Sequence, residues 1–282
     1  MQTFDTIESF RKYVSGHRKP GKTIGFVPTM GALHAGHLAL VRRCKQENGL
    51  AVCSIYVNPT QFTNPEDLRN YPRTLEADRQ LLQEAGCDVL FAPTDAEMYP
   101  QTPQLKMDFG SLETVLEGKF RPGHFNGVGL VVAKLFHIVQ PDMAYFGQKD
   151  LQQCLVIRRL IRDLSFPIAL EIHPTVREAD GLAMSSRNRR LTPAQRAAAP
   201  LLYQALSMAG QVLAGGGTVA AATKTVETHL SQSGEIRLEY FEVADSQSLS
   251  RIASAVIVPP YALCIAAHLG SVRLIDNVLV GS

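Results

Sequence analysis

Two histidines three residues apart, His34 and His37, are the most suggestive chemical groups in this sequence. They follow a short apolar run at 24–27 and stand where a helix is expected to begin. At a helix start both imidazoles lie on one side of the first turn, beside unpaired backbone N–H groups that favour an anion. Imidazole N–H groups are additional donors to phosphate oxygens. Gly36 removes a side chain that would block the close approach of a phosphate or an adenine ring.

Two other interpretations of the histidine pair stay open. A His-x-x-His spacing is often found on a surface or in a core without any ligand. A zinc site needs further ligands, and no third Cys, Glu or His stands at a convincing spacing. The context favours a nucleotide site, because ligands collect at the carboxyl ends of parallel strands, where this pair is expected.

The string "GQKD" at 147–150 is a second candidate phosphate site. Gly147 follows an apolar strand, so Lys149 and Asp150 are expected at the same edge of the sheet as the histidines. Lys149 suits phosphate as a point charge. Asp150 can accept a hydrogen bond from a ribose hydroxyl or help to hold Mg²⁺. The alternative is a solvated turn with a salt bridge.

Uncharged amides and hydroxyls supply further candidates. Gln61 and Gln153 donate and accept at once, which suits a substrate with hydroxyls and a carboxylate, although ordinary surface glutamine is the alternative. Ser185, Ser186 and Arg187 can hold a polyphosphate together, although Ser-Ser-Arg is common in loops.

Three charged residues rank below these. Arg121 can clamp a carboxylate, or it belongs to a plain surface loop. Glu76 and Asp78 are expected to solvate a helix face rather than to lie near Mg²⁺.

A sheet with helices on both faces is needed to position these residues. The pattern predicts helices over 3–16, 36–46, 74–85, 128–139 and 150–163, and strands over 22–29, 51–57, 89–91 and 143–146. Strands that alternate with helices indicate an α/β, Rossmann-like, doubly wound parallel sheet.

The pattern changes after about residue 175. A polar loop is followed by a helix that Thr192 and Pro193 open, predicted to run to about Ala214, and then by a second helix over 219–231. Strands are expected over 237–243, 255–258, 263–268 and 272–275. We therefore expect two domains: 1–176, which binds the nucleotide, and a smaller α+β domain, 177–282, with the 177–190 loop at the junction.

The composition excludes several classes of protein. The 282 residues are 45% hydrophobic and 19% charged, and the net charge of +2 gives no reason to expect nucleic-acid binding. Five scattered cysteines make no C-x-x-C pair, so a cytoplasmic location is the default. The N-terminus has no signal-peptide pattern, and no run of about 18 apolar residues predicts a membrane span.

Longer strings around the candidate residues resemble a known family. "HAGH" is similar to the signature of nucleotidylyltransferases and class I aminoacyl-tRNA synthetases. The string "PTMGALHAGH" at 28–37 resembles, more specifically, the pantothenate synthetase (pantoate–β-alanine ligase) family. Five further strings agree: "YVNPTQF" at 56–62, "YPRT" at 71–74, "FRPGHFNGV" at 120–128, "FGQKDLQQ" at 146–153 and "READGLAMSSRN" at 177–188.

The resemblance implies an ATP site with His37, His34 and Lys149 as its catalytic residues. The residues implied to contact ATP are Met30, Gly31, Ala32, Leu33, His34, Ala35, Gly36, His37, Gly147, Gln148, Lys149, Asp150, Val176, Met184, Ser185, Ser186 and Arg187. Gln148 stands where the family usually has Glu, which leaves the role of that side chain open. The resemblance also implies that Gln61 touches pantoate and β-alanine, and that Gln153 touches pantoate.

The implied reaction is the ATP-dependent, AMP-forming condensation of (R)-pantoate with β-alanine through a pantoyl adenylate. ATP is then a substrate, Mg²⁺ the metal, and the enzyme a homodimer whose second domain closes as a lid over ATP. The resemblance does not identify the Mg²⁺ ligands, and it leaves open whether His37 donates a proton or only a hydrogen bond.

Two rival functions share this fold. One is a nucleotidylyltransferase that moves a nucleotide onto a phosphorylated acceptor. The other is a non-enzymatic nucleotide-binding protein, against which the intact His34, His37, Lys149 and Arg187 argue. A tRNA synthetase is disfavoured, because the chain lacks an anticodon-binding appendage and an evident basic face.

Overall fold

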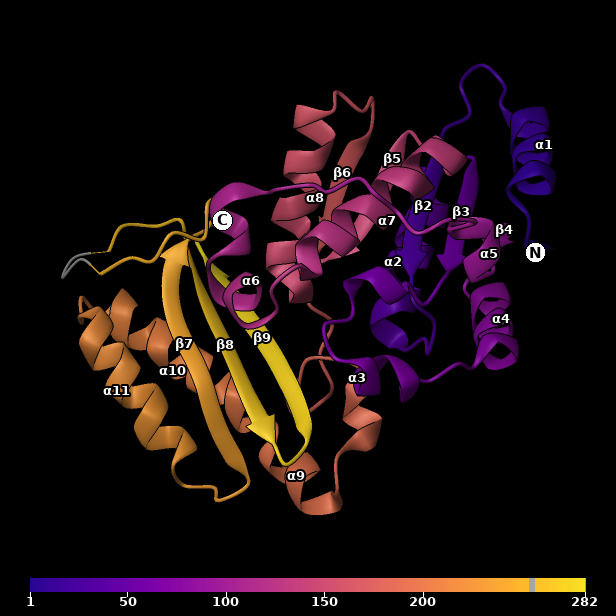
Figure 1. Ribbon diagram of the computed structural model, residues 1–282. Helices are drawn as coiled ribbons and strands as arrows, with labels where there is room; N and C mark the ends of the chain where they lie inside the picture. The colour runs from indigo at the N-terminus through magenta and orange to yellow at the C-terminus, as the bar shows by residue number, and fades with distance from the viewer. Residues whose placement is uncertain (254–256, 282) are drawn as a thin grey trace.

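The computed structural model describes residues 1–253 and 257–281, which form two sheets with their helices (Figure 1). The strands of the larger sheet are β1 (Gln2–Phe4), β2 (Ile24–Thr29), β3 (Leu50–Ile55), β4 (Val89–Phe91), β5 (Met143–Gly147) and β6 (Ala169–His173). The helices of this half are α1 (Ile7–His17), α2 (Ala35–Glu47), α3 (Pro65–Arg69), α4 (Leu75–Glu84), α5 (Asp95–Met98), α6 (Leu116–Phe120), α7 (His124–Val139) and α8 (Leu151–Asp163).

All the strand pairs of the larger sheet are parallel, in the order β1-β4-β3-β2-β5-β6. The chain moves from β2 to β3 on one side, whereas β5 lies on the other side of β2. The strand order therefore reverses between β2 and β5, and a crevice is expected at their carboxyl ends.

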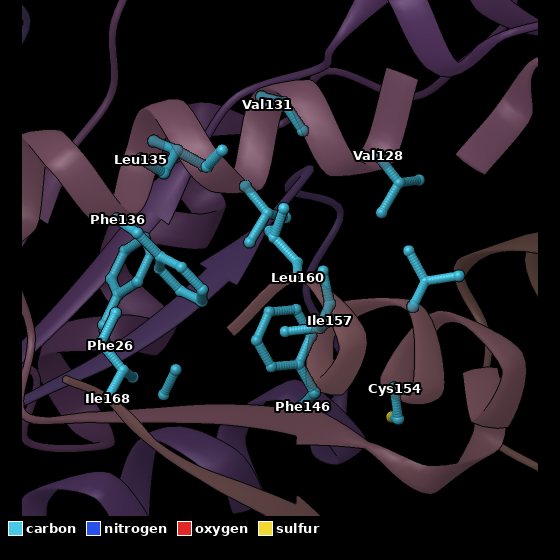
Figure 2. Close-up of a cluster of buried hydrophobic side chains, with 14 of the residues drawn as sticks. Phe26, Val128, Val131, Leu135, Phe136, Phe146, Cys154, Ile157, Leu160 and Ile168 are labelled. Atoms are coloured by element: carbon cyan, nitrogen blue, oxygen red, sulfur yellow. The ribbon is translucent and has the colours of Figure 1, made fainter. Parts of the chain in front are cut away.

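Helices cover both faces of this sheet, because its strands are apolar on both sides. In β3, Leu50 and Val52 face the cluster that includes α7 and α8, whereas Ala51, Cys53 and Ile55 face α2 and α4. Figure 2 shows the first of these clusters, where the β2 and β5 phenylalanines lie close to side chains of α7 and α8. This two-sided core holds the strand ends, and the residues that follow them, in fixed positions.

A second, three-stranded antiparallel sheet has the order β7-β8-β9, with strands Ile236–Asp245, Tyr261–Leu269 and Val272–Val280. Its accompanying helices are α9 (Pro193–Ala198), α10 (Leu201–Ala214) and α11 (Val219–Leu230). Ala205 and Ala209 of α10 are fully buried in a common cluster with Leu263 and Ile265 of β8, so small side chains bring helix and sheet together. The predicted α/β fold with a smaller α+β part is confirmed.

Three predicted elements need correction. Residues 2–4 form a strand, and the first helix begins only at Ile7. The helix predicted from Thr192 to Ala214 is two helices, because Pro200 has no N–H to continue the α9 ladder. In the strand predicted over 255–258, residues 255 and 256 lie outside the described residues, and Ile257 and Val258 are not in a strand.

Strand β6 and the first turn of α7 were not predicted. β6 lies at the edge of the sheet, paired along its length with β5, and it brings His173 and the residues after it to the carboxyl edge. The alternation of Ile168, Leu170 and Ile172 was the available signal. Among the described residues, none of the helices combines the length and apolar character that crossing a bilayer requires.

Candidate functional site

A cleft opens at the carboxyl ends of β2 and β5, where the strand order reverses. Its wall contains residues from both halves of the chain. The predicted site residues that line it are Met30, His34, Gly36, His37, Gln61, Gly147, Lys149, Asp150, Gln153, Val176, Met184, Ser185, Ser186 and Arg187. The expectation that the histidine pair and the 147–150 turn lie at one sheet edge is therefore confirmed, and the roles of the residues stay a prediction.

The turn between β2 and α2 is fixed by a buried carboxylate. Asp78 of α4, 2% exposed, accepts hydrogen bonds from the backbone N–H of Ala32 at 2.9 Å and of Leu33 at 2.8 Å. Gly31 and Ala32 both have positive φ, 79° and 51°, which turns their neighbouring N–H groups toward this carboxylate. The expectation that Asp78 solvates a helix face is wrong, whereas Glu76 on the same helix is exposed as expected.

The two histidines form the N-terminal cap of α2. His34 Nδ1 accepts from the Gly36 N–H at 3.2 Å, and His37 Nδ1 accepts from the His34 N–H at 3.4 Å. A ring nitrogen that accepts carries no proton, so in both neutral rings the hydrogen is on Nε2. A Cβ at Gly36 would lie 3.0 Å from the His34 ring, so a larger residue would require the ring to shift by a few tenths of an ångström.

Both imidazoles are neutral at physiological pH. Burial lowers the pKa of His34 to about 3, and the adjacent His37 and Lys149 lower it further. Burial also lowers the pKa of His37 to about 4, although Asp150 opposes this effect. The ring centroids lie 4.0 Å apart, which a doubly protonated pair would not tolerate. The cleft therefore has two neutral Nε2–H donors side by side.

Lys149 and Asp150 follow β5 and lie beside the histidines in the cleft wall. Lys149 Nζ is 3.6 Å from an Asp150 carboxylate oxygen. Enclosure in the cleft would raise the pKa of Asp150, but the Lys149 and Arg187 charges outweigh this and lower it. Asp150 is therefore a carboxylate next to a cation at neutral pH.

The loop after β3 presents Gln61 in a fixed orientation. Asn58, 1% exposed, donates to Gln61 Oε1 at 3.0 Å and to the Gly127 carbonyl at 3.2 Å. Gln61 Nε2 lies 3.1 Å from the sulfur of Met30. A Cβ on Gly127 would lie 2.2 Å from the Thr60 carbonyl oxygen, so only glycine allows α7 to approach this loop so closely.

His124 and Arg121 extend this loop's support. His124 Nδ1 lies 2.8 Å from the Gln61 carbonyl oxygen and Nε2 lies 3.2 Å from Arg121 Nη1. Burial and the Arg121 charge lower the pKa of His124 to about 4, so its Nδ1–H donates while Nε2 accepts. This role of His124 was not predicted, because nothing in the string "FRPGHFNGV" shows that Gln61 is its partner.

The segment 184–187 is folded back on Val176. The Met184 N–H donates to the Val176 carbonyl at 3.0 Å, which pairs the two predicted ATP residues. Ser185 Oγ accepts from the Arg187 N–H at 3.2 Å and caps a short 3₁₀ turn. The Arg187 guanidinium donates to Asp67 of α3 at 3.2 Å.

Five predicted ATP residues do not line the cleft. Ala32 and Leu33 are buried, and Gln148 Nε2 donates to Asn277 Oδ1 of β9 at 3.3 Å. The other two, Gly31 and Ala35, lie in the same turn and at the start of α2. The family resemblance identifies the segments that form the cleft, whereas the fold determines which side chains of each segment point into it.

The fit of a divalent cation depends on Asp150. Among the described residues, no group of three or more His, Cys, Asp or Glu side chains is arranged to hold a metal. Mg²⁺ is typically held by one or two carboxylates together with substrate phosphates, and the ionised Asp150 in the cleft fits that requirement.

Known proteins of one family are similar to this chain over almost its whole length. The family model described as pantoate-beta-alanine ligase matches residues 2–279. The pantothenate synthetase of Cytophaga hutchinsonii is 47% identical, with 99% of both chains covered. That of Moorella thermoacetica is 48% identical, also with 99% of both chains covered.

Solved structures of the same family are also similar to this one. A pantothenate synthetase from Thermus thermophilus is 47% identical, with a TM-score of 0.92 and 99% of both chains covered. A Francisella tularensis pantoate-beta-alanine ligase, solved in complex with beta-gamma ATP and beta-alanine, is 34% identical, with a TM-score of 0.82 over 99% of this chain and 97% of that one. The chain described here belongs to the pantoate–β-alanine ligase family.

Proposed function

We propose that this protein condenses (R)-pantoate with β-alanine to form pantothenate, in an ATP-dependent, AMP-forming reaction. The observation that carries the proposal is the composition of the cleft wall. Neutral donors from His34 and His37, the Lys149 cation and the amides of Gln61 and Gln153 all line one cleft at the strand-order reversal.

Adenylation is the first step. The pantoate carboxylate attacks the α-phosphorus of ATP, the bond to the bridging oxygen breaks, and pyrophosphate leaves. Negative charge grows on the bridging and leaving oxygens, where Lys149 and the Nε2–H groups of His34 and His37 stabilise it. Because both rings are neutral, we assign His37 the role of hydrogen-bond donor rather than proton donor. Asp150 would help to hold Mg²⁺, which would supply further charge neutralisation.

Amide formation is the second step. The β-alanine amine attacks the acyl carbonyl, AMP leaves with its bonding electron pair, and the amine loses a proton to solvent. The Gln61 amide, oriented by Asn58, serves both substrates, and Gln153 holds a pantoate hydroxyl. The apolar side chains of Val128, Val131 and Leu135 in the same wall suit the dimethyl group of pantoate.

The remaining predicted ATP contacts come from four segments of the chain. Backbone atoms at 30–36, 147–148 and Val176 and the side chains at 184–187 are proposed to enclose the nucleotide. Arg187 would exchange its pairing with Asp67 for a phosphate group.

A half-reaction assay tests this function. Pantoate-dependent exchange of labelled pyrophosphate into ATP is expected, followed by AMP and pantothenate formation once β-alanine is added. A nucleotidylyltransferase would not form the amide, and a nucleotide-binding protein would show no exchange. Absence of exchange from folded, ATP-binding protein would contradict the proposal.

Four further properties are proposed on the family resemblance: the Mg²⁺ requirement, a homodimer, a domain boundary near residue 176 with residues 177–282 as a lid, and a cytoplasmic location. All five cysteines are unpaired and buried, which suits a reducing compartment. Sedimentation equilibrium tests the dimer, and ATP protection of the 177–190 segment from proteolysis tests closure.

A further inference from the structure

The two segments that carry cations into the cleft come from separate parts of the chain. Residues 147–150 follow β5, and residues 184–187 follow the loop that leaves β6. Each must hold its charge within a fraction of an ångström to stabilise the same phosphate chain. A pair of buried residues on β9, Asp276 and Asn277, contacts the 147–150 turn directly and is linked to the 184–187 segment.

Asn277, 4% exposed, holds the first segment. Its Nδ2 donates to the backbone carbonyls of Gln148 and Lys149, both at 2.9 Å, and its Oδ1 accepts from Gln148 Nε2 at 3.3 Å. Both hydrogens of the amide are thus used on the turn that presents Lys149. A hydrocarbon side chain at this position would leave two carbonyls without their donor.

Asp276, also 4% exposed, holds the second segment through Arg177. The guanidinium of Arg177 binds the carboxylate at 2.6 and 3.0 Å, donates to the Gly181 carbonyl at 3.1 Å and stacks 3.7 Å from the Tyr203 ring centroid. Arg177 pairs with Ala183 across a β-bridge. The direction in which residues 184–187 leave this bridge therefore depends on Arg177.

The two residues are also joined to each other. The Asn277 N–H donates to Asp276 Oδ1 at 2.7 Å, and Arg177 Nη2 reaches the Asn277 carbonyl at 3.3 Å. A continuous path of hydrogen bonds therefore runs from the Lys149 carbonyl to the Gly181 carbonyl. We propose that Asp276 and Asn277 are positioning residues that align the 147–150 and 184–187 segments on the phosphates of ATP.

The proposal rests on the adenylation reaction proposed above and predicts which half-reaction depends on the pair. Adenylation needs both segments around a triphosphate, whereas attack of β-alanine on a preformed pantoyl adenylate needs no polyphosphate to be held. Loss of the pair should therefore slow the first half-reaction selectively. A residue that only stabilises the fold would slow both half-reactions together, or neither.

Asn277→Leu is the main variant, because leucine has nearly the same shape and cannot donate. We expect kcat for pantoate-dependent pyrophosphate exchange to fall about 30-fold, with KM for pantoate changed less than about 2-fold. The rate at which β-alanine consumes added pantoyl adenylate should stay within about 3-fold of the wild-type rate.

Gln152→Met is the matched control. Gln152 is 5% exposed, and its Nε2 likewise donates to two carbonyls, those of Leu112 and Val115, at 2.7 and 2.9 Å. Its Oε1 also accepts from the Glu117 N–H at 3.0 Å, so each variant loses three side-chain hydrogen bonds, but the partners of Gln152 lie outside the nucleotide segments. Its melting temperature should fall as much as that of Asn277→Leu, while exchange stays within about 2-fold of wild type.

Asp276→Asn tests the same link without removing bulk, in case Asn277→Leu does not fold. Exchange should fall about 10-fold, again with aminolysis preserved. Equal losses in both half-reactions, or unchanged exchange in a folded variant, would overturn the positioning role. Wild-type protein without any pantoate-dependent exchange would instead overturn the proposed function, so the two failures are distinguishable.

Discussion

The cleft is bounded by two segments that are held in opposite ways. The β2–α2 turn at 29–37 continues strand β2, and the buried Asp78 carboxylate of α4 holds it through two backbone hydrogen bonds. The 177–190 segment is held at its base by the buried Arg177–Asp276 pair, and beyond it by ion pairs of Arg196 with Glu178 and Asp180, whose side chains are about one-third to two-fifths exposed. We call the first side the rigid wall, because buried hydrogen bonds hold it, and the second side the adaptable wall, because partly exposed ion pairs hold its outer part.

The two sides differ because buried groups lie in a medium of low dielectric constant, whereas exposed groups are in contact with water. Hydrogen bonds to a buried carboxylate are hard to break, because the freed groups would stay without partners. Partly exposed ion pairs exchange for water at little cost and weaken with salt. A site that must admit ATP and then surround it benefits from one wall of each kind.

The largest expected effect is at the rigid wall. His37→Ala should lower pantoate-dependent pyrophosphate exchange about 1,000-fold, because a preorganised donor to the leaving phosphates is lost. His37→Gln restores a neutral donor and should recover about 10-fold. The exposed His17→Ala serves as control. If His37 were a proton donor, glutamine would restore nothing and exchange would decline as the pH rises past about 6.5.

Removing the Asp78 carboxylate, which fixes the β2–α2 turn, should lower the stability of the protein. Asp78→Ala leaves the N–H groups of Ala32 and Leu33 without their acceptor in a buried turn, and should lower the free energy of unfolding by about 3 kcal/mol. Urea denaturation measures it. Glu76→Ala, on the exposed side of the same helix, should change it by less than about 0.5 kcal/mol. Equal effects from the two variants would show that the wall is not anchored as described.

The neutral histidines make stability pH-dependent. The pKa of His34 is about 3 in the folded protein and 6.5 in the unfolded chain, so between these values only the unfolded chain binds the proton. Stability therefore rises with pH in this window and is lost on acidification below about 6.5, by up to about 1.4 kcal/mol per pH unit for each such histidine.

His34→Asn isolates that contribution. Asparagine can still accept from the Gly36 N–H as a helix cap, but it does not titrate. The unfolding free energy of this variant should fall less steeply between about pH 6.5 and about pH 4 than that of the wild type. Parallel curves for the two proteins would mean that His34 is not held neutral by burial.

The smallest effect is expected at the adaptable wall. Arg196→Ala removes the pairs with Glu178 and Asp180 and should lower the unfolding free energy by only about 0.5 kcal/mol at low salt, and by less at about 1 M salt. The same variant should be cleaved faster by trypsin within 177–190 in the absence of ATP. A loss as large as that of Asp78→Ala would remove the contrast between the two walls.

Local sequence patterns were sufficient to predict the bounds of elements whose apolar residues repeat at the period of a helix or strand. β4 was predicted with its observed bounds, and α2, α8 and α11 within about two residues, because their apolar faces repeat at the expected period. β6 was missed at an edge with partly exposed residues, and Pro200 was overlooked inside an alanine-rich run.

The sequence motifs located the candidate site, but they did not reveal the buried residues that hold it in place. Asp78, His124, Asp276 and Asn277 act on partners between 45 and 129 residues away along the chain. No periodicity or local spacing records such a partner. The direction of Gln148, away from the cleft and toward Asn277, was equally invisible in the sequence.

By itself the sequence determined the kinds of chemistry available: two imidazoles at a helix start, a lysine and a carboxylate after a strand, and hydroxyls beside an arginine in a loop. These follow from residue type and short-range geometry. Only the tertiary structure decided how they act. Burial made the imidazoles neutral donors, a carboxylate from α4 fixed the turn before them, and β9 linked the two segments that face them. Desolvation and long-range hydrogen bonds exist only once distant parts of the chain are packed together.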